Sequence, residues 1–313
     1  MGKLAIIFPG QGAQSVGMGL DAYEADVTAK RIFDKADEVL GYSLTDLIFH
    51  GPEDQLKLTY HTQPALLTTS IAYYELLRAA GIQPDYVAGH SLGEYSALVV
   101  AGVLTFEDAV KTVRLRGEFM DQAVPAGLGA MAAVLGAERE ALATLCASIS
   151  KDIGIVELAN VNCPGQIVVS GSSEGVQAVV EQGKSIGAKR VIPLVVSGPF
   201  HSSMMKPASV KLAEVLAGVT FHDAAIPVIA NVTAEPVVQA DVIRNLLVQQ
   251  VYSPVLWEDC VNQMIADGVD TFIEVGSGNV LTGLMKKINK DVSCHTLDSI
   301  EAIKFWLGAE AHA

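Results

Sequence analysis

The sequence has little positive charge and no long apolar run. Its 35 acidic residues outnumber 21 basic ones, and the resulting net charge of −14 argues against nonspecific binding to nucleic acid, which needs a basic face. The apolar run near the N-terminus stops at Pro9 and is too short for a signal peptide, and no later run is long enough to span a bilayer. We therefore expect a cytoplasmic protein that binds neither nucleic acid nor membrane.

Paired cysteines are also missing. The four cysteines form no Cys-x-x-Cys pair and have no metal-ligand spacing, which predicts buried thiols in a reducing compartment and no metal site. Only 18% of the residues are charged and 50% are hydrophobic, so extended disorder is not expected. The 313 residues are enough for one large α/β domain with a second, smaller one.

Strand-like and helix-like segments alternate along most of the chain. The expected strands are 3–8, 86–89, 226–231, 271–276 and 293–297, and the expected helices include 63–81 and 105–123. This alternation predicts an α/β fold with a mainly parallel sheet that is covered by helices on both faces.

The middle of the chain has a different order. Its segments run β-α-β-β-α-β, at 129–136, 138–150, 155–162, 166–171, 172–187 and 189–196. That order is the ferredoxin-like signature. We therefore expect a large α/β-hydrolase-like domain, residues 1–125 and 198–313, with a small ferredoxin-like domain, residues 126–197, inserted into it and a cleft between them.

Residues 89–93 read Gly-His-Ser-Leu-Gly, a GxSxG motif between a strand-like and a helix-like segment. This context suits a nucleophile elbow, in which a sharp turn exposes the serine hydroxyl at the edge of the sheet. Ser91 is therefore the candidate nucleophile. A buried turn serine is the alternative, because GxSxG is a common pattern.

A glycine-rich stretch, FPGQG at 8–12, follows the first strand. It lacks the third glycine of GxGxxG and the GK[ST] of a phosphate loop, which argues against a nucleotide site. In a parallel sheet this stretch ends on the same rim as the elbow. The backbone N–H groups of Gln11 and Leu92 are therefore expected to form an oxyanion hole, and a plain glycine turn is the alternative.

Among the seven histidines, His201 is the best candidate for the general base. It lies in a loop where the chain returns from the small domain to the large one. His90 adjoins Ser91, but neighbours in a tight turn point apart. No acidic residue lies between 197 and 213, so the sequence favours a Ser–His dyad without a carboxylate. A solvated loop histidine is the alternative.

These motifs together resemble the malonyl-CoA:acyl-carrier-protein transacylase family over essentially the whole chain. Further landmarks follow in order: TQPAL (62–66), RG (116–117), GAMAA (129–133), PGQIVVSG (164–171), FHSSMMKP (200–207), QVYSPVLW (250–257) and EVGSGNVLTGL (274–284). The ordered set is specific, although no single motif is decisive. The resemblance implies that Ser91 is acylated, that His201 is its base, and that the carbonyl of Gln250 orients His201.

The resemblance also assigns a substrate site. Arg116 alone reads as a surface charge, but the family implies that it anchors the acyl carboxylate, which a planar guanidinium binds bidentately. Phe200 would crowd a methyl branch and so favour malonyl over methylmalonyl. The other residues expected at this site are Gln63, His90 and Asn162. The chain departs from malonyl-specific polyketide acyltransferases at Gly198-Pro199, where these enzymes have His-Ala, and from the family at Ser277 and Asn279, where Pro and Lys are common.

The implied activity is ping-pong transfer of malonyl from malonyl-CoA to the phosphopantetheine thiol of holo acyl carrier protein, through a malonyl-serine. No cofactor and no metal are required, because the coenzyme A thioester is itself a substrate. The alternatives are a serine esterase or thioesterase with the same elbow, a discrete polyketide-type acyltransferase, and a noncatalytic carrier-binding module. A monomer is expected.

An acidic enzyme and a usually acidic carrier need a local positive patch in order to associate. We expect Lys189, Arg190, Lys286 and Lys287 to border the cleft mouth, where they would attract the carrier and the coenzyme phosphates. A solvated charged face is the alternative.

Overall fold

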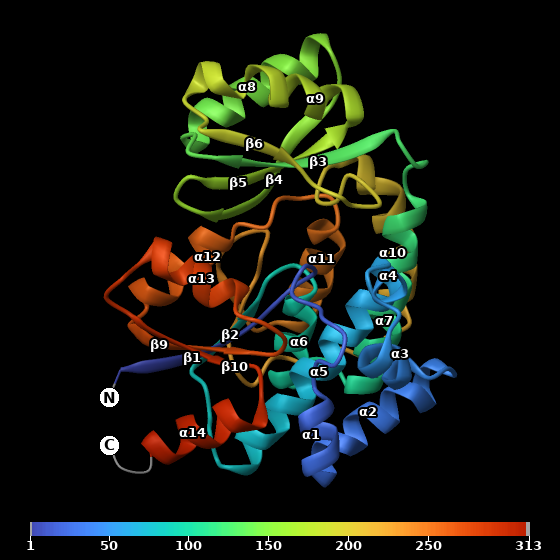
Figure 1. The fold of residues 1–313 in the computed structure, drawn as a ribbon, viewed down its shortest axis with the longest axis vertical. Helices are drawn as coiled ribbons and strands as arrows, with labels where there is room; N and C mark the ends of the chain where they lie inside the picture. Colours follow the sequence, from blue (N-terminus) through green and yellow to red (C-terminus); the bar gives the residue numbers. More distant parts are fainter. Residues whose placement is uncertain (1, 311–313) are drawn as a thin grey trace.

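The computed structural model describes residues 2–310 and contains two sheets, which Figure 1 shows one above the other. The lower, six-stranded sheet has the order β10-β9-β1-β2-β7-β8. Its strands are β1 (Lys3–Phe8), β2 (Tyr86–Gly89), β7 (Val228–Ile229), β8 (Pro236–Val237), β9 (Val269–Val275) and β10 (Ser293–Leu297). All neighbouring pairs in it are parallel except β7 with β8. The predicted parallel sheet is thus confirmed.

Helices cover both faces of this sheet because side chains alternate along each strand. From β1, Ile6 and Phe8 join a core shared with α5, α6 and α7, whereas Ala5 and Ile7 join a core shared with α12 and α13. The helices here are α1 (Leu20–Ala25), α2 (Val27–Leu40), α3 (Leu44–His50), α4 (Glu53–Leu56), α5 (Thr59–Ala79), α6 (Gly93–Val100), α7 (Phe106–Gln122), α10 (Lys206–Ala217), α11 (Ala240–Gln250), α12 (Trp257–Ala266), α13 (Val280–Ile288) and α14 (Ile300–Glu310). Within residues 2–310, no helix is both long enough and apolar enough to cross a bilayer.

The upper sheet is antiparallel and has the order β4-β5-β3-β6. Its elements follow the predicted sequence β-α-β-β-α-β: β3 (Gly129–Leu135), α8 (Arg139–Asp152), β4 (Val156–Cys163), β5 (Gln166–Ser172), α9 (Ser173–Gln182) and β6 (Arg190–Pro193). One face of the sheet packs on α8 and α9 in a separate small core. The other face, with Met131 and Val168, joins the core of the large unit.

Three predicted elements were too long. The strand expected at 226–231 pairs only at Val228–Ile229, because the chain then turns back at Ala234, whose φ is +58°, to form β8. The strand expected at 189–196 ends at Pro193, and the helix expected to reach 187 becomes the 3₁₀ helix Gly183–Ile186. A second 3₁₀ helix, Ser203–Met205, precedes α10.

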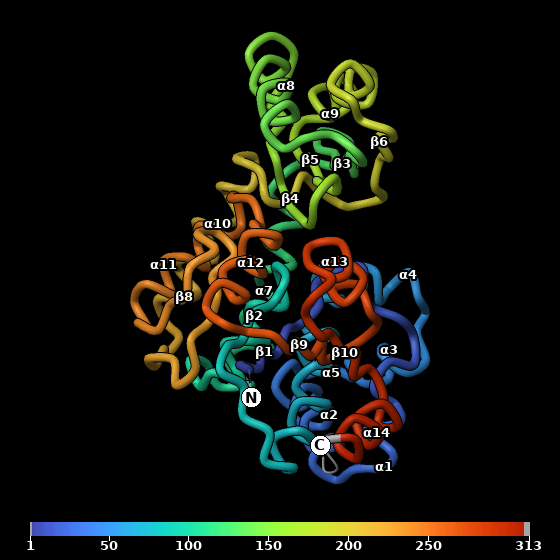
Figure 2. The backbone as a smooth tube through the Cα atoms, turned by 90° about the vertical axis from the view of Figure 1, so that its left-hand side faces the viewer, coloured from blue at the N-terminus to red at the C-terminus, as the bar shows by residue number. Residues whose placement is uncertain are grey.

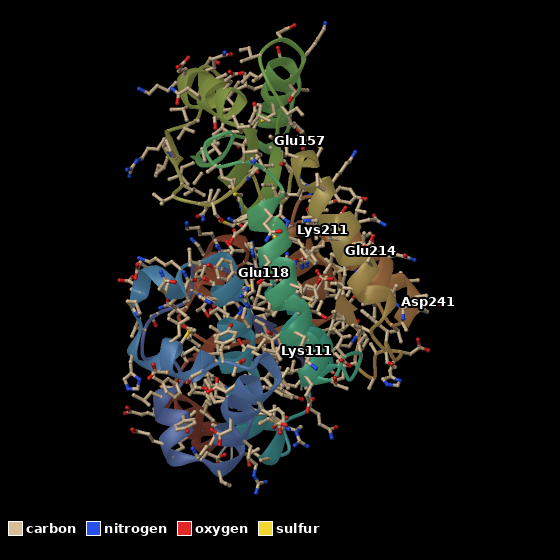
Figure 3. The ribbon with its side chains drawn as sticks, turned by 90° about the vertical axis from the view of Figure 1, so that its right-hand side faces the viewer. Lys111, Glu118, Glu157, Lys211, Glu214 and Asp241 are labelled. Atoms are coloured by element: carbon tan, nitrogen blue, oxygen red, sulfur yellow. The ribbon has the colours of Figure 1, made fainter. Side chains whose placement is uncertain are left out.

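β4 joins the small sheet to the segment between α11 and α12 of the large unit, as the quarter-turned view in Figure 2 helps to follow. Val161 donates a backbone hydrogen bond to Val255, and Val255 donates one back to Ala159, each at 2.8 Å. Nearby, the backbone N–H of Ser203 donates to Glu157 at 2.6 Å, where Figure 3 shows Glu157 above α10. These bonds hold the small sheet against the large unit on one side of the cavity described next.

Candidate active site

Ser91 occupies a very tight turn between β2 and α6. Its φ is +52°, a left-handed conformation that costs a non-glycine residue energy and persists only when the surroundings impose it. A Cβ on Gly89 would lie 1.9 Å from the backbone of Gly93, and one on Gly93 would lie 2.1 Å from the carbonyl oxygen of Phe8. Only glycine fits at both positions, so the GxSxG pattern follows from backbone packing around the serine.

The hydroxyl of Ser91 meets the imidazole of His201. The distance from Oγ to Nε2 is 2.7 Å, and the other ring nitrogen, Nδ1, lies 2.8 Å from the backbone oxygen of Gln250. Because a carbonyl oxygen only accepts, Nδ1 carries the proton and Nε2 is left free to accept the hydroxyl proton. The structure thus joins the three residues in the expected order.

Burial keeps His201 neutral. Its side chain is almost fully enclosed, and burial, with the positive charge of Arg116 as the next cause, lowers the pKa of His201 to about 3. The imidazole is therefore unprotonated near neutral pH, as a general base must be.

Arg116 is buried on α7 with 1% of its surface exposed. It donates to Gln63 Oε1 at 2.7 Å, to Gln250 Oε1 at 2.9 Å and to Ser91 Oγ at 3.1 Å. Its Nε has no hydrogen-bond partner, and no carboxylate forms an ion pair with it among the described residues. A buried charge without an ionic partner is costly, and an incoming anion would relieve that cost.

A cavity of about 130 Å³ opens beside these groups. Its polar lining comprises Gln11, Gln63, His90, Ser91, Arg116, Asn160 and His201, and its apolar lining comprises Leu92, Met120, Met131, Leu194, Val196 and Phe200. The backbone N–H groups of Gln11 and Leu92 make no hydrogen bond within the described chain. A Cβ on Gly10 would lie 2.4 Å from the His90 oxygen, so glycine brings this loop against the elbow.

Comparison with known proteins identifies the family. The family model "Acyl transferase domain" matches residues 5–299. The chain is 54% identical over 304 residues to "Malonyl CoA-acyl carrier protein transacylase" of Bacillus subtilis, covering 97% of this chain and 96% of that one. The protein of the same name from Staphylococcus aureus MRSA252 is 49% identical, with 98% and 99% covered. The chain belongs to the malonyl CoA-acyl carrier protein transacylase family.

Solved structures of malonyl transacylases agree with this assignment. An acyl carrier protein S-malonyltransferase from Vibrio cholerae matches with a TM-score of 0.95 at 46% identity, covering 97% of this chain and 99% of that chain. A malonyl-transacylase in complex with its type II PKS acyl-carrier protein matches with a TM-score of 0.95 at 42% identity, covering 98% and 99%. The resemblance found in the sequence is thus confirmed, and the chain spans nearly the full length of its relatives.

Other predicted residues of the transacylase site lie close by, but not all line the cavity. Phe200 lines it, as does Gln63, which faces Arg116. Asn162 does not: its Oδ1 lies 2.9 Å from His90 Nε2, so this side chain reaches the cavity only through the histidine. The hydrogen bond of the His90 side chain is thus made with Asn162, whereas the Ser91 hydroxyl bonds to His201.

The four predicted basic residues do not line the cavity. Lys189, Arg190, Lys286 and Lys287 are all exposed. Lys287 on α13 donates to Gln166 Oε1 on β5 at 3.0 Å and so crosses between the two units. Arg190 and Gln166 flank the same residue of β3 in the strand register, which places them on one side of the small sheet.

Asn231 was missed in the sequence. Its Oδ1 accepts from the backbone N–H of Ser91 at 2.7 Å, and its Nδ2 donates to the oxygen of Gly89 at 2.8 Å. These two bonds hold the strained turn from the side of β7. A signal was available, since Asn231 is the last residue of the strand predicted at 226–231, and the end of a strand in a parallel sheet lies at the rim where the elbow also ends. In the part of the chain described, no three His, Cys, Asp or Glu side chains gather as a metal site.

Proposed function

We propose that this chain transfers a malonyl group from malonyl-CoA to the phosphopantetheine thiol of holo acyl carrier protein. The observation that carries the proposal is the buried guanidinium of Arg116, which lies within hydrogen-bond distance of the nucleophile and forms no ion pair with a carboxylate of residues 2–310. A malonyl thioester places a carboxylate two bonds from its reactive carbonyl, so one group can bind Arg116 while the other faces Ser91. The names of the relatives support this substrate.

In the first half-reaction, Ser91 Oγ attacks the thioester carbonyl while its proton passes to His201 Nε2. The N–H groups of Gln11 and Leu92 stabilise the tetrahedral oxyanion, and one such donor typically contributes roughly 10²–10³ in rate. The C–S bond then breaks, the proton on His201 passes to the departing coenzyme A sulfur, and malonyl-Ser91 remains. Pairing of the malonyl carboxylate with Arg116 also offsets the charge that lowers the pKa of His201, which makes the imidazole a stronger base.

In the second half-reaction, the carrier thiol takes the place of coenzyme A. His201 accepts the thiol proton, the sulfur attacks the malonyl ester, and the proton returns to Ser91 Oγ as the ester C–O bond breaks. His201 takes each proton from the attacking nucleophile and gives it to the leaving group, so the proposed steps require no metal and no cofactor. The acidic composition and the four free thiols support a monomeric, cytoplasmic enzyme that binds no nucleic acid or membrane.

We further propose that the chain forms two domains, each with a known type of fold. The strand order β4-β5-β3-β6 supports a ferredoxin-like small domain at residues 126–197, and the strand–serine–helix turn supports an α/β-hydrolase-like large domain at residues 1–125 and 198–313.

Arg116→Ala is the test of this function. We expect acylation of Ser91 by malonyl-CoA to fall by about 10²- to 10³-fold, because the truncation removes the partner of a buried carboxylate. Acylation by acetyl-CoA, which has no carboxylate to lose, should change much less. Intact-mass measurement of the acyl-enzyme with each donor gives both rates.

The matched control is Arg114→Ala, which removes an arginine from the same helix that pairs with Glu118 outside the cavity. It should leave both rates near wild type. An equal loss for malonyl-CoA and acetyl-CoA in Arg116→Ala would contradict the proposal. Release of free malonate as fast as transfer would favour the hydrolase alternative.

The type II polyketide complex among the structural relatives raises a second candidate, a discrete acyltransferase that serves a polyketide carrier. Transfer rates to fatty-acid-type and polyketide-type carriers, compared at equal concentration, decide between the two. A preference for the polyketide-type carrier would support the second candidate.

The proposed carrier patch is tested by the double charge reversal Lys286→Glu, Lys287→Glu. We expect KM for the carrier to rise about three- to tenfold at low salt, since charges at the edge of an interface act mainly on encounter. Acylation of Ser91 by saturating malonyl-CoA should not change. Lys111→Glu reverses an exposed charge on α7 (Figure 3) and should leave KM unaltered. A KM that stays constant in the double variant would remove the patch from consideration.

A further inference from the structure

One buried carboxylate beside the site takes no part in the steps above. Glu94 on α6 is 2% exposed and follows the nucleophile by three residues. Its Oε2 accepts from Gln250 Nε2 at 2.7 Å and from the backbone N–H of Asn231 at 3.2 Å. Both donors are uncharged, so no ion pair explains why an acid is kept at this position.

The amide of Gln250 connects this carboxylate to Arg116. Its Oε1 accepts from Arg116 at 2.9 Å, and its Nε2 donates to Glu94 at 2.7 Å and to the backbone oxygen of Ser91 at 3.0 Å. The oxygen end of the amide therefore faces the cation and the nitrogen end faces the acid, an orientation that both neighbours favour. A single side chain thus separates the buried acid from the guanidinium.

We propose that Glu94 is a positioning residue that acts on Arg116 through Gln250. When Glu94 is ionised, its negative charge offsets part of the positive charge of Arg116, so the guanidinium binds the substrate carboxylate less tightly. The inference rests on the proposed function, because it needs an anionic acyl group. The Glu94 carboxylate and the substrate carboxylate lie on different sides of one cation in a poorly solvated site. Their mutual repulsion is therefore little screened and opposes binding of the substrate.

The charged and titratable groups near Glu94 define the pH range of this competition. They are Arg116 on α7, Cys260 on α12 and Tyr95 on α6 itself, and burial raises the pKa of both Cys260 and Tyr95 so that each stays neutral. Burial also raises the pKa of Glu94 to about 7, although its two hydrogen bonds and Arg116 act in the opposite direction. The acid is therefore mostly neutral below this pH and mostly ionised above it.

The sign of the effect follows. As pH rises through about 7, Glu94 gains negative charge and malonyl-CoA should bind less well. We expect the half-saturating malonyl-CoA concentration for acylation of Ser91 to rise about tenfold from about pH 6 to about pH 8, the size that Coulomb's law gives for charges roughly 10 Å apart at an effective dielectric constant of about 20. His201 is neutral throughout this range and contributes no change.

The experiment is rapid-quench intact-mass measurement of acyl-Ser91 at both pH values, with malonyl-CoA and with acetyl-CoA. Acetyl-CoA carries the same coenzyme phosphates without the acyl carboxylate, so the ratio of the two half-saturating concentrations isolates Arg116. Glu94→Gln keeps the hydrogen-bond acceptor for Gln250 and removes the charge. In this variant the ratio should be constant with pH and equal to the low-pH value of wild type.

Glu258→Gln is the matched control, since Glu258 is a half-buried acid on α12 that does not line the cavity and whose pKa is also raised by burial. It should follow wild type. A ratio that does not change with pH in wild type overturns the inference even if Glu94→Gln fails to fold, and so does an equal loss at every pH in Glu94→Gln. Absence of malonyl-enzyme from wild type at both pH values would instead overturn the proposed function, and this inference with it.

Discussion

Ser91→Ala is expected to lower malonyl transfer by roughly 10⁴-fold or more, because loss of a nucleophile removes the covalent route and leaves only binding and oxyanion stabilisation. Incubation with malonyl-CoA should add no malonyl mass to the variant. The fold should persist, since alanine at this position has the same left-handed backbone that serine has and its N–H still donates to Asn231. Steady-state transfer and intact mass are the two measurements.

Ser96→Ala is the control for this variant. Ser96 lies on the same helix, is fully buried, and its hydroxyl has no hydrogen-bond partner among the described residues. Its removal should leave transfer close to wild type. Malonyl mass on the Ser91→Ala protein would mean that another residue is the nucleophile, and the mechanism proposed above would then be wrong.

The second large effect is expected for His201→Ala. Acylation of Ser91 should slow by roughly 10²- to 10⁴-fold, the usual contribution of a positioned general base. Unlike Ser91→Ala, this variant should still accumulate malonyl-enzyme slowly, because Arg116 still donates to Ser91 Oγ and the oxyanion donors remain. Its residual rate should rise with pH, since hydroxide must then remove the proton. Single-turnover acylation over a pH series measures both features.

His222→Ala removes an exposed histidine outside the cavity and should behave as wild type. If His201→Ala acylated at the wild-type rate with a normal pH profile, the hydrogen bond between Ser91 and His201 would have no catalytic meaning. The two main variants should therefore differ in the intermediate: Ser91→Ala should form no malonyl-enzyme, whereas His201→Ala should form it slowly.

Local patterns were enough to predict much of this molecule. The strands at 3–8, 86–89 and 293–297 occur with the predicted bounds. The first ends just before Pro9 and the second at Gly89, and both are residue types that mark turns in a sequence. The elbow was also readable, since Gly89 and Gly93 stand where a side chain would collide with backbone. Both features depend on residues that are close together in the sequence.

Long-range contacts were not readable in the same way. Nothing near Arg116 marks it as buried, and its burial results from the packing of α7 beside Gln63 and Gln250, which lie 53 and 134 positions away. Only the family resemblance pointed to it. Asn231 and Glu94 escaped because their partners are 140 and 156 positions distant. The carrier patch stays a prediction, since a lysine pattern gives composition but not the direction in which flexible side chains extend.

The size of the cavity has a consequence for the direction of the proposed reaction. A volume of about 130 Å³ admits a short acyl head but leaves the long thiol-bearing arm outside. The donor and the acceptor therefore use the same cavity. One thioester is exchanged for another, so the bonds broken and the bonds formed are of the same kinds. Such an exchange has almost no preferred direction of its own. The net direction of acyl transfer would follow from the relative concentrations of the two thioesters and their free thiols in the cell. The protein would set only the rate at which the exchange reaches equilibrium.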